Sequence, residues 1–214
     1  MAKKKLPPKP FMYPKPAVLA GALVKGKPNF NTIANCGIVG WAPPMVFVSS
    51  YKSHYTNIGI RKQKTFSVNI PSALMAKKVD YCGIYSGRKV DKSEIFEVFY
   101  GELETAPLIE ECPVNLECRL VKTIRFDEEE IFIGEIVAIY ADEKCMTEGK
   151  LDIKKINPLI YSTSDKKYFK IGSEIGKAYS IGKNSPLFLR EKKGKTKEKR
   201  APFAPLSGNK KSGI

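Results

Sequence analysis

Short apolar runs, rather than long helical stripes, dominate the hydrophobic pattern of this chain. Residues 32–39 and 45–51 each fit one strand, and the loop between them contains two prolines. The second run is continuous and rich in β-branched side chains, which is typical of a buried strand. Residues 17–24 fit a preceding strand, and residues 26–29 (Gly-Lys-Pro-Asn) predict the turn that follows it.

A short polar segment after the second run predicts a helix over residues 55–62, with Ser53 as its N-cap. Residues 65–70 then alternate apolar and polar side chains, which predicts a half-buried strand with Ser67 and Asn69 facing outward. Ser72 is suited to cap a second helix. At helical spacing its inner side carries the apolar residues Leu74, Met75, Val79, Cys82 and Ile84.

The clearest long hairpin pairs residues 114–125 with residues 131–140. In the first strand Asn115, Glu117 and Arg119 alternate with apolar residues, so we expect all three to face outward. The acidic run 128–130 falls in the predicted turn and is expected to be a solvated tip. Residues 168–172 fit a last short strand.

Strands therefore dominate, with a few short helices between them. This pattern predicts a mainly β fold, an antiparallel barrel with short inserted helices, because closing a sheet removes its exposed edges. The chain lacks a G-x-G-x-x-G motif between a strand and a helix, and it also lacks a P-loop. A Rossmann nicotinamide domain is therefore not expected.

Charge is spread unevenly along the 214 residues. The net charge is +15, of which +7 falls in residues 190–214. That segment is low in apolar residues, so we expect a basic, disordered tail. Residues 1–12 form a basic, proline-rich lead-in, which leaves residues 13–189 as one folded domain. One function that the charge supports is a nucleic-acid-associated binding module that uses the basic tails.

Five cysteines without a C-x-x-C pair, together with a single histidine, predict neither a zinc site nor a disulfide scaffold. The odd number of cysteines fits a reducing, cytoplasmic location. No apolar run reaches the length of a membrane span, and the lysine-rich start is not followed by the apolar segment of a signal peptide.

Acid–base or nucleophilic catalysis has little support, because the chain has only His54 and lacks a G-x-S-x-G motif. A binding site for an anion has more support in the sequence. The strand over 45–51 ends in Ser49 and Ser50 and is followed by Lys52 and the predicted helix start, and helix N–H groups, hydroxyls and cations all suit a phosphate. The alternative is a core strand followed by a capped surface helix.

Four motifs occur in a fixed order along the chain. They are N-x-x-T-I-A-N-C-G at 29–37, P-P-M-V-x-V-S at 43–49, Y-T-x-x-x-I-x-x-x-x-x-F-x-V-N-I-P at 55–71 and S-G-x-x-x-D-K at 86–92. The ordered set resembles the flavin reductase-like, FMN-binding split-barrel family, in particular its flavoredoxin branch. The resemblance covers roughly residues 13–181, most of the chain.

This resemblance implies an antiparallel split barrel that binds FMN, and it implies two groups of contacts. Along the isoalloxazine and ribityl chain would lie Asn31, Thr32, Ala34, Asn35 and Cys36. Around the ribityl and phosphate would lie Ser49, Ser50, Lys52, His54 and Thr56. The fourth motif adds Lys92, which would reach the flavin, and Ser86, which would shape the loop.

Each assignment has a simpler alternative at this stage. Asn35 can be a partner for a neighbouring strand, Cys36 a small core residue and Lys92 a surface charge. His54 stands where many family members carry arginine, so its protonation would make FMN affinity depend on pH. Tyr161 and Tyr168 can cover the flavin or fill the barrel.

The resemblance implies one of two activities for an FMN-binding flavoprotein. The chain is either a flavoredoxin-like electron carrier between redox partner proteins or an NAD(P)H-dependent flavin or ferric reductase. No catalytic residue is assigned. The family also implies a homodimer. A related split-barrel protein that uses another cofactor, such as pyridoxal phosphate or haem, remains an alternative.

Overall fold

The computed structural model describes residues 2–183, which belong to two compact units, 1–172 and 173–214. The first unit holds every helix and strand described below, whereas residues 173–183 of the second contain no helix or strand. The expected tail over 190–214 lies outside the described residues. No helix within 2–183 has the length and apolar character needed to cross a membrane.

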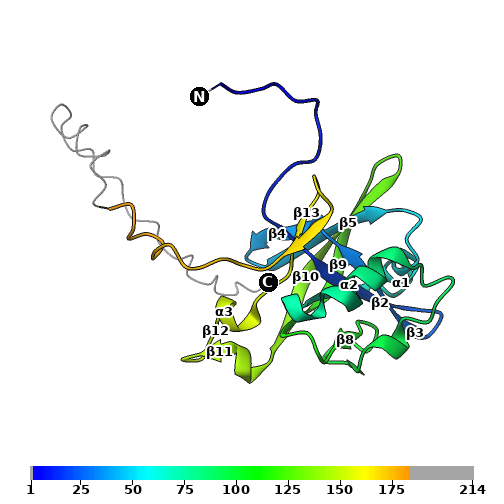
Figure 1. The fold of residues 1–214 in the computed structure, drawn as a ribbon. Coiled ribbons are helices and arrows are strands. Elements are labelled where there is room, and N and C mark those ends of the chain that lie inside the picture. Colours follow the sequence, from blue (N-terminus) through cyan, green and yellow to red (C-terminus); the bar gives the residue numbers. More distant parts are fainter. Residues whose placement is uncertain (1, 184–214) are drawn as a thin grey trace, which may run out of the picture. The chain divides into compact units, whose positions relative to one another are not determined.

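One seven-stranded antiparallel sheet forms the body of the first unit (Figure 1). In spatial order its strands are β3 (Lys27–Ile33), β2 (Val18–Val24), β6 (Thr65–Ile70), β9 (Val114–Arg125), β10 (Glu129–Ala141), β5 (Pro44–Tyr51) and β4 (Cys36–Trp41). The long β9–β10 hairpin, which the sequence predicted, lies near the centre of this order.

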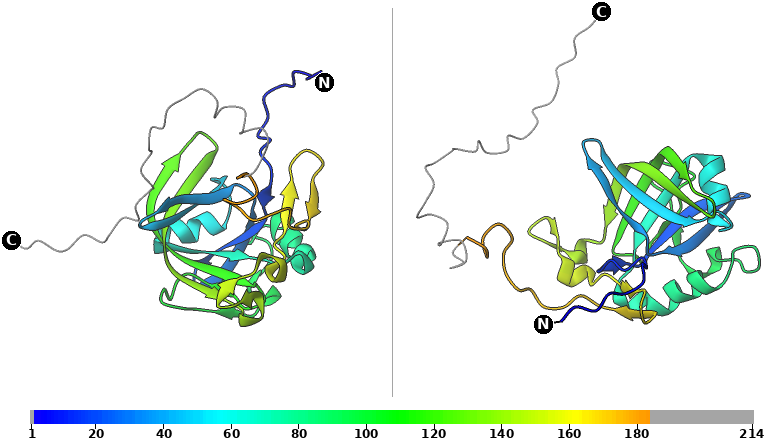
Figure 2. Two further views of the ribbon diagram at one scale, coloured as in Figure 1. Left: turned by 90° about the vertical axis from the view of Figure 1, so that its left-hand side faces the viewer. Right: turned by 90° about the horizontal axis from the view of Figure 1, so that it is seen from above.

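The two edges of this sheet are consecutive in the chain. β3 ends at Ile33 and β4 begins at Cys36, so residues 34–35 alone join one edge to the other. Such a link spans about 10 Å, whereas a flat seven-stranded sheet is about 29 Å across. The sheet therefore curls until its edges meet at this seam, as the view from above in Figure 2 shows. This confirms the predicted mainly β, antiparallel split barrel.

Two short helices flank the strands that carry the candidate site. α1 (Thr56–Gln63) lies on β2, and α2 (Ala76–Ile84) lies on β3 (Figure 1). α1 approaches closely because Gly59 has no side chain; a Cβ there would lie 2.5 Å from the Leu23 carbonyl oxygen. The other helical turns are η1 (Ala73–Met75), η2 (Ser93–Ile95), η3 (Glu143–Cys145) and α3 (Ile153–Ile156).

Three small sheets complete the unit. β1 (Lys15–Pro16) pairs with β13 (Ile160–Ser162), which pairs with β14 (Lys167–Phe169). The other two are β7 (Val98–Phe99) with β8 (Leu108–Ile109), and β11 (Met146–Thr147) with β12 (Lys150–Leu151).

The core consists of two apolar clusters on opposite faces of the sheet. The first includes Phe66, Phe132 and Ile60 and fills the barrel, and the second includes Phe30, Val79 and Phe96 between the sheet and α2. A sheet covered on both faces leaves its central strands little exposed surface. The helix α2 is therefore held by its inner side, on which Val79 and Cys82 are fully buried.

Several boundaries differ from those expected. The run 32–39 is not one strand, because the seam at 34–35 divides it between β3 and β4. The turn before β3 is Lys25-Gly26, both with positive φ, and residues 27–29 already belong to the strand. α1 begins at Thr56, after Tyr55, and Ser53 does not cap it.

The expected facing of several polar residues was wrong. Ser67, Asn69, Asn115 and Glu117 are buried, because β6 and β9 are central strands with both faces covered. Their polar groups are satisfied internally; the Asn115 amide, for instance, donates to Asn69 Oδ1 at 2.8 Å. Glu130 is buried rather than solvated at a turn. Conversely, Leu74 and Ile84 are exposed. Leu74 lies in η1 and Ile84 ends α2, so the buried side of the helix predicted after Ser72 is narrower than expected.

Candidate functional site

A hollow of about 230 Å³ opens where β3, the start of α1 and the loop over 84–92 meet. We call it the His54 hollow, and its lining includes Asn29, Asn31, His54, Thr56, Ser86 and Lys92. Five of these residues were predicted from the sequence to bind a cofactor. The structure therefore brings together residues that are up to 61 positions apart in the chain.

Two asparagines of β3 hold the start of α1 in place. Asn29 and Asn31 are two residues apart in a strand, so their side chains project from the same face. Asn29 Nδ2 donates to Thr56 Oγ1 at 2.6 Å, and Asn31 Nδ2 lies 2.8 Å from His54 Nδ1. Both bonds join the sheet to the polar segment that begins α1, and so they fix the wall of the hollow.

The contact with Asn31 also fixes which ring nitrogen of His54 is free. An amide nitrogen can only donate, so Nδ1 accepts and the neutral ring carries its proton on Nε2. Burial lowers the pKa of His54, and the nearby Lys92 ammonium lowers it further. At neutral pH His54 is therefore an uncharged N–H donor rather than a cation.

Lys92 is the buried cation of the hollow, and only 3% of its surface is exposed. Its Nζ donates to the Phe30 carbonyl at 2.9 Å and to the Cys82 carbonyl at 2.7 Å. An ammonium has three N–H donors, and Lys92 forms no ion pair within residues 2–183. Burial lowers its pKa, since the charge has lost its hydration. Lys92 is thus not a surface residue, and it has no acidic partner within residues 2–183.

The loop over 86–92 reaches this position because Gly87 passes close to β3 and α1. A Cβ at Gly87 would collide with the Asn29 amide and the Tyr55 ring. At the end of the loop, Asp91 Oδ1 accepts from the backbone N–H of Ser93 at 3.0 Å. The glycine and the aspartate of the fourth motif therefore set the path that brings Lys92 inward.

Thr32 and Ala34 line a neighbouring hollow of about 330 Å³. We call it the Tyr161 hollow, and its lining includes Thr32, Ala34, Gly83, Tyr161, Lys166 and Tyr168. Gly83 lines both hollows. The two tyrosine rings pack 5.6 Å apart between centroids and form an aromatic wall beside β3. The polar His54 hollow and the more apolar, aromatic Tyr161 hollow therefore adjoin at Gly83.

Five predicted residues lie in neither hollow. Asn35 is at the seam, where its Oδ1 accepts from Lys15 Nζ at 2.9 Å, and Cys36 and Ser49 are half-buried in β4 and β5. Burial raises the pKa of Cys36 to about 12, so its thiol is protonated at neutral pH. Ser50 donates to Asn57 Oδ1 at 3.0 Å, and Lys52 donates to the Asp127 carbonyl at 2.9 Å.

Sequence reasoning missed a buried network behind the hollow. Glu130 of β10 accepts from Asn57 Nδ2 at 2.9 Å and pairs with Arg61, which joins α1 to the barrel. It also missed Asn29, although the Asn-x-Asn spacing in a strand was a usable signal. Glu130 had no such signal, because its acidic neighbours made it resemble a turn.

The composition of the His54 hollow suits a phosphate group. His54 Nε2–H, the third N–H of Lys92 and the hydroxyls of Thr56 and Ser86 are donors or potential donors. No carboxylate is among its described lining residues. A buried cation without an acid partner is costly unless an anion joins it, so a phosphate would supply the missing counter-charge.

Comparison with known proteins shows the family of this chain. The family model described as "Flavin reductase like domain" matches residues 11–170. The solved structure of flavoredoxin from Methanosarcina acetivorans is 49% identical, covers 86% of this chain and 98% of its own, and superposes with a TM-score of 0.83. Flavoredoxin of Desulfovibrio vulgaris (Miyazaki F) is 35% identical with a TM-score of 0.80, over 85% of this chain and all of its own.

An uncharacterised protein from Archaeoglobus fulgidus is 31% identical over 145 residues, which are 67% of this chain and 81% of that protein. The chain belongs to the flavin reductase-like family. Within that family it is similar to the flavoredoxins, as the ordered motifs indicated.

Proposed function

We propose that this protein is a flavoprotein that binds FMN without a covalent bond and transfers electrons. The observation that carries the proposal is the lining of the His54 hollow. It includes buried Lys92, which forms no ion pair within residues 2–183, and His54, whose Nε2 carries the ring proton, and it includes no carboxylate among the described residues. The hollow lies in a chain of the flavin reductase-like family, and two similar structures are flavoredoxins.

We assign the phosphate of FMN to Lys92, His54, Thr56 and Ser86. The Tyr161 hollow, with Thr32 and Ala34 on one wall, is suited to the flat ring system, because its two tyrosine rings offer flat apolar surface. Its charged lining residues are Asp80, which accepts from the Tyr168 hydroxyl at 3.0 Å, and Lys166. Asn31 holds His54 in the donating tautomer. Asn35, Cys36 and Ser49 remain proposed contacts at the seam. We assign Ser50 to holding the start of α1 through Asn57, and Lys52 to joining the segment before α1 to the β9–β10 turn through the Asp127 carbonyl.

FMN, when bound, supplies the redox chemistry, since it can accept a hydride and pass electrons on singly. The residues of this chain bind it, orient it and shield it. Two roles fit this arrangement: a carrier between redox proteins, and an NAD(P)H-dependent flavin or ferric reductase. They differ in whether a nicotinamide can reach the bound cofactor.

The visible absorption spectrum of the purified protein, with FMN added if it is colourless, tests the proposal. We expect a bound-flavin spectrum. Under anaerobic conditions, rapid bleaching by NADH or NADPH would identify a reductase. Bleaching by dithionite alone would identify a carrier that is fed by another protein. A protein that fails to take up FMN would refute the cofactor assignment.

We further propose a homodimer in the cytoplasm, with residues 13–189 as its functional domain and residues 1–12 as a lead-in. Two observations support this. Edge strand β4 exposes Ile38, Val39 and Trp41, and an apolar sheet edge favours a second copy of the chain. All five cysteines are free thiols, which fits a reducing compartment.

A further inference from the structure

A second buried lysine, Lys15, lies at the seam of the barrel. Only 8% of its surface is exposed, and its Nζ donates to Asn35 Oδ1 at 2.9 Å. Lys15 forms no ion pair within residues 2–183. An ammonium has three N–H donors, so two of them have no partner in the described part of the chain. A cation held away from water without an acid partner favours the binding of an anion.

Strand pairing places Lys15 beside the Tyr161 hollow. β1 is antiparallel to β13, and Lys15 lies directly opposite Tyr161. Residues that lie directly opposite each other in an antiparallel pair project from the same face. Ala17, two residues further on, continues this pairing through its N–H, which donates to the Leu159 carbonyl at 3.0 Å, and it also lines the hollow. Lys15 therefore projects from the face of this segment that borders the hollow.

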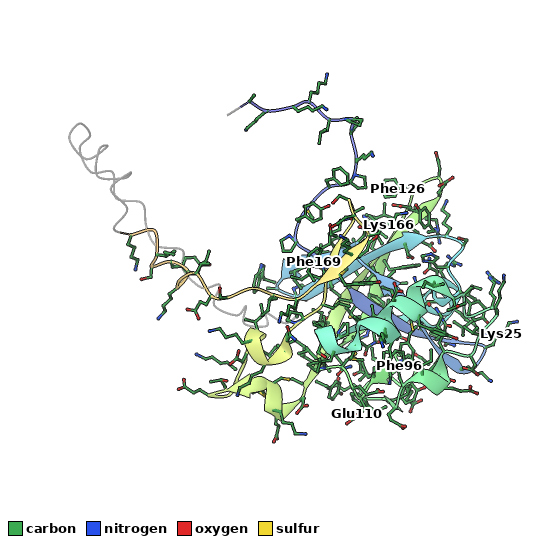
Figure 3. The ribbon with its side chains drawn as sticks, in the orientation of Figure 1. Lys25, Phe96, Glu110, Phe126, Lys166 and Phe169 are labelled. Atoms are coloured by element: carbon green, nitrogen blue, oxygen red, sulfur yellow. The ribbon has the colours of Figure 1, made fainter. Side chains whose placement is uncertain are left out.

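The ammonium of Lys15 reaches the end of the hollow that lies at the seam. Ala34 lines the hollow, and Asn35, which accepts from Lys15 Nζ, is the next residue. Lys166 is a lining cation of the same hollow, but it is exposed in the turn between β13 and β14 (Figure 3). Of these two lysines only Lys15 is shielded from water, and a shielded charge acts more strongly on its neighbours.

The charge of a flavin ring changes when the ring is reduced. A hydride donor adds two electrons and one proton to the neutral oxidised ring, which forms an N–H bond at N5 and leaves one negative charge over N1 and the C2 carbonyl. A second proton, taken up at N1, would neutralise this charge. A protein cation near N1 tunes the flavin, because an opposite charge favours the ionised form of its neighbour.

We propose that Lys15 meets the pyrimidine edge of the bound flavin and stabilises the negative charge that reduction places there. The two buried lysines, Lys15 and Lys92, then meet different charges of the same cofactor. Lys92 holds the phosphate in either redox state, whereas Lys15 acts on the reduced ring and so favours the reduced state. The inference rests on the proposed function, because it requires FMN in the two hollows.

Three substitutions at Lys15 separate its charge from its hydrogen bond. K15M removes both, K15Q removes the charge and keeps an N–H donor, and K15R keeps both. The matched control is K167M, which removes a lysine from an exposed position of β14 outside both hollows. For each full-length protein, flavin fluorescence gives the dissociation constant of oxidised FMN, and an anaerobic redox titration at mildly alkaline pH gives the midpoint potential. Uptake of oxidised FMN also shows that each variant is folded.

We expect K15M and K15Q to weaken the binding of reduced FMN, relative to oxidised FMN, by about 10-fold. This change lowers the midpoint potential of a two-electron couple by about 30 mV. K15R and K167M should keep the potential of the wild type. In acid the reduced ring takes up its second proton, so the difference should shrink. The absorbance of the reduced proteins should show this protonation at a higher pH in K15M than in the wild type.

Equal midpoint potentials in the wild type, K15M and K15Q would overturn the proposal. It would also be overturned if K15Q matched the wild type while K15M did not, since the hydrogen bond to Asn35 would then be the cause. In both cases the flavin assignment would stand, because the proteins would still bind oxidised FMN. A wild type that binds no FMN would instead refute the proposed function, and the role of Lys15 with it.

Discussion

At the scale of single residues, Lys92 has two roles that sequence alone presents as alternatives. Its Nζ caps the end of α2 through the Cys82 carbonyl and holds β3 through the Phe30 carbonyl. A cation at a helix C-terminus is favourable because the last carbonyls carry partial negative charge. The same ammonium lines the His54 hollow. We therefore expect it to affect both stability and cofactor affinity.

Replacing Lys92 by methionine should lower the free energy of unfolding of the apoprotein by about 1–3 kcal/mol, because two carbonyls lose their donor. FMN should bind about 10-fold more weakly, since a charge-assisted hydrogen bond is lost. Urea denaturation and flavin fluorescence measure the two effects. K150M, at an exposed site, should change neither. A K92M protein with unaltered FMN affinity would remove Lys92 from the phosphate seat.

The protonation of His54 predicts that FMN affinity depends on pH. Burial and Lys92 lower its pKa below the usual value of 6.5, so the ring gains charge only in mildly acidic solution. FMN affinity should therefore rise from about pH 7 to pH 5 relative to a H54Q variant. The phosphate of FMN titrates alike in both proteins, so their ratio isolates the histidine. A constant ratio across this range would show that His54 does not meet the phosphate.

The free energy of unfolding of the apoprotein, in contrast, should fall as the pH is lowered. Since the folded pKa of His54 is lowered, the unfolded chain binds more protons below about pH 6.5. The free energy of unfolding therefore contains a His54 contribution that is complete above that pH and is lost as the pH falls. Denaturation curves of the wild type and H54Q should diverge in acid and run parallel above neutrality.

At the scale of elements, α1 is held at two places. Asn29 and Asn31 of β3 fix its start, and the pair of Arg61 with buried Glu130 fixes its later turns to β10. The helix ends at Lys64, which adopts a left-handed conformation. Because the start of α1 forms the wall of the His54 hollow, this second attachment supports the site from behind.

Replacing Arg61 by alanine should lower the free energy of unfolding by about 2–4 kcal/mol, because it leaves a buried carboxylate with less compensation. The double variant R61A/E130Q should recover much of this loss, since the uncompensated charge is gone. Chemical denaturation of the wild type, both single variants and the double variant gives the coupling energy. Strict additivity of the two single effects would contradict the network.

Element types were largely predictable, whereas the burial of polar positions was not. Apolar runs and the alternation of apolar with polar residues predicted strands β5, β6, β9 and β10. Both patterns are local properties of the sequence. Glu117 shows what the pattern hides. Its carboxylate accepts from the backbone N–H groups of residues 101–103 at 2.9–3.2 Å, a partnership that depends on a loop 14 to 16 residues upstream.

At the scale of the whole molecule, the exposed edge strand β4 bears on assembly. Trp41 is 90% exposed, next to half-exposed Ile38 and Val39. If this edge forms the proposed dimer contact, sedimentation should give twice the 23.9 kDa mass of the chain, and W41S should shift the equilibrium toward the monomer. L74S, which also removes an exposed apolar side chain, is the matched control. A monomeric wild type would refute the dimer.

The sequence predicted that the sheet closes into a barrel, but it did not predict where along the chain the two edges meet. The run 32–39 is hydrophobic enough for one strand, and only the three-dimensional arrangement shows that it divides at residues 34–35. Thr32 and Ala34 consequently line one hollow, whereas Asn35 turns to Lys15. Local pattern cannot detect such a division, because both halves keep strand-like composition.

The seam has a further consequence for how the barrel keeps its curvature. Among the described strands, β3 and β4 share no hydrogen-bonded ladder, so the polypeptide itself ties the two edges together. A circularly permuted chain that starts at Asn35 would retain every strand pair of the sheet and yet lose this tie. Because the apolar cluster that includes Phe66 and Phe132 fills the barrel, such a protein would show whether burial of that cluster alone keeps the sheet curled when the covalent tie is gone.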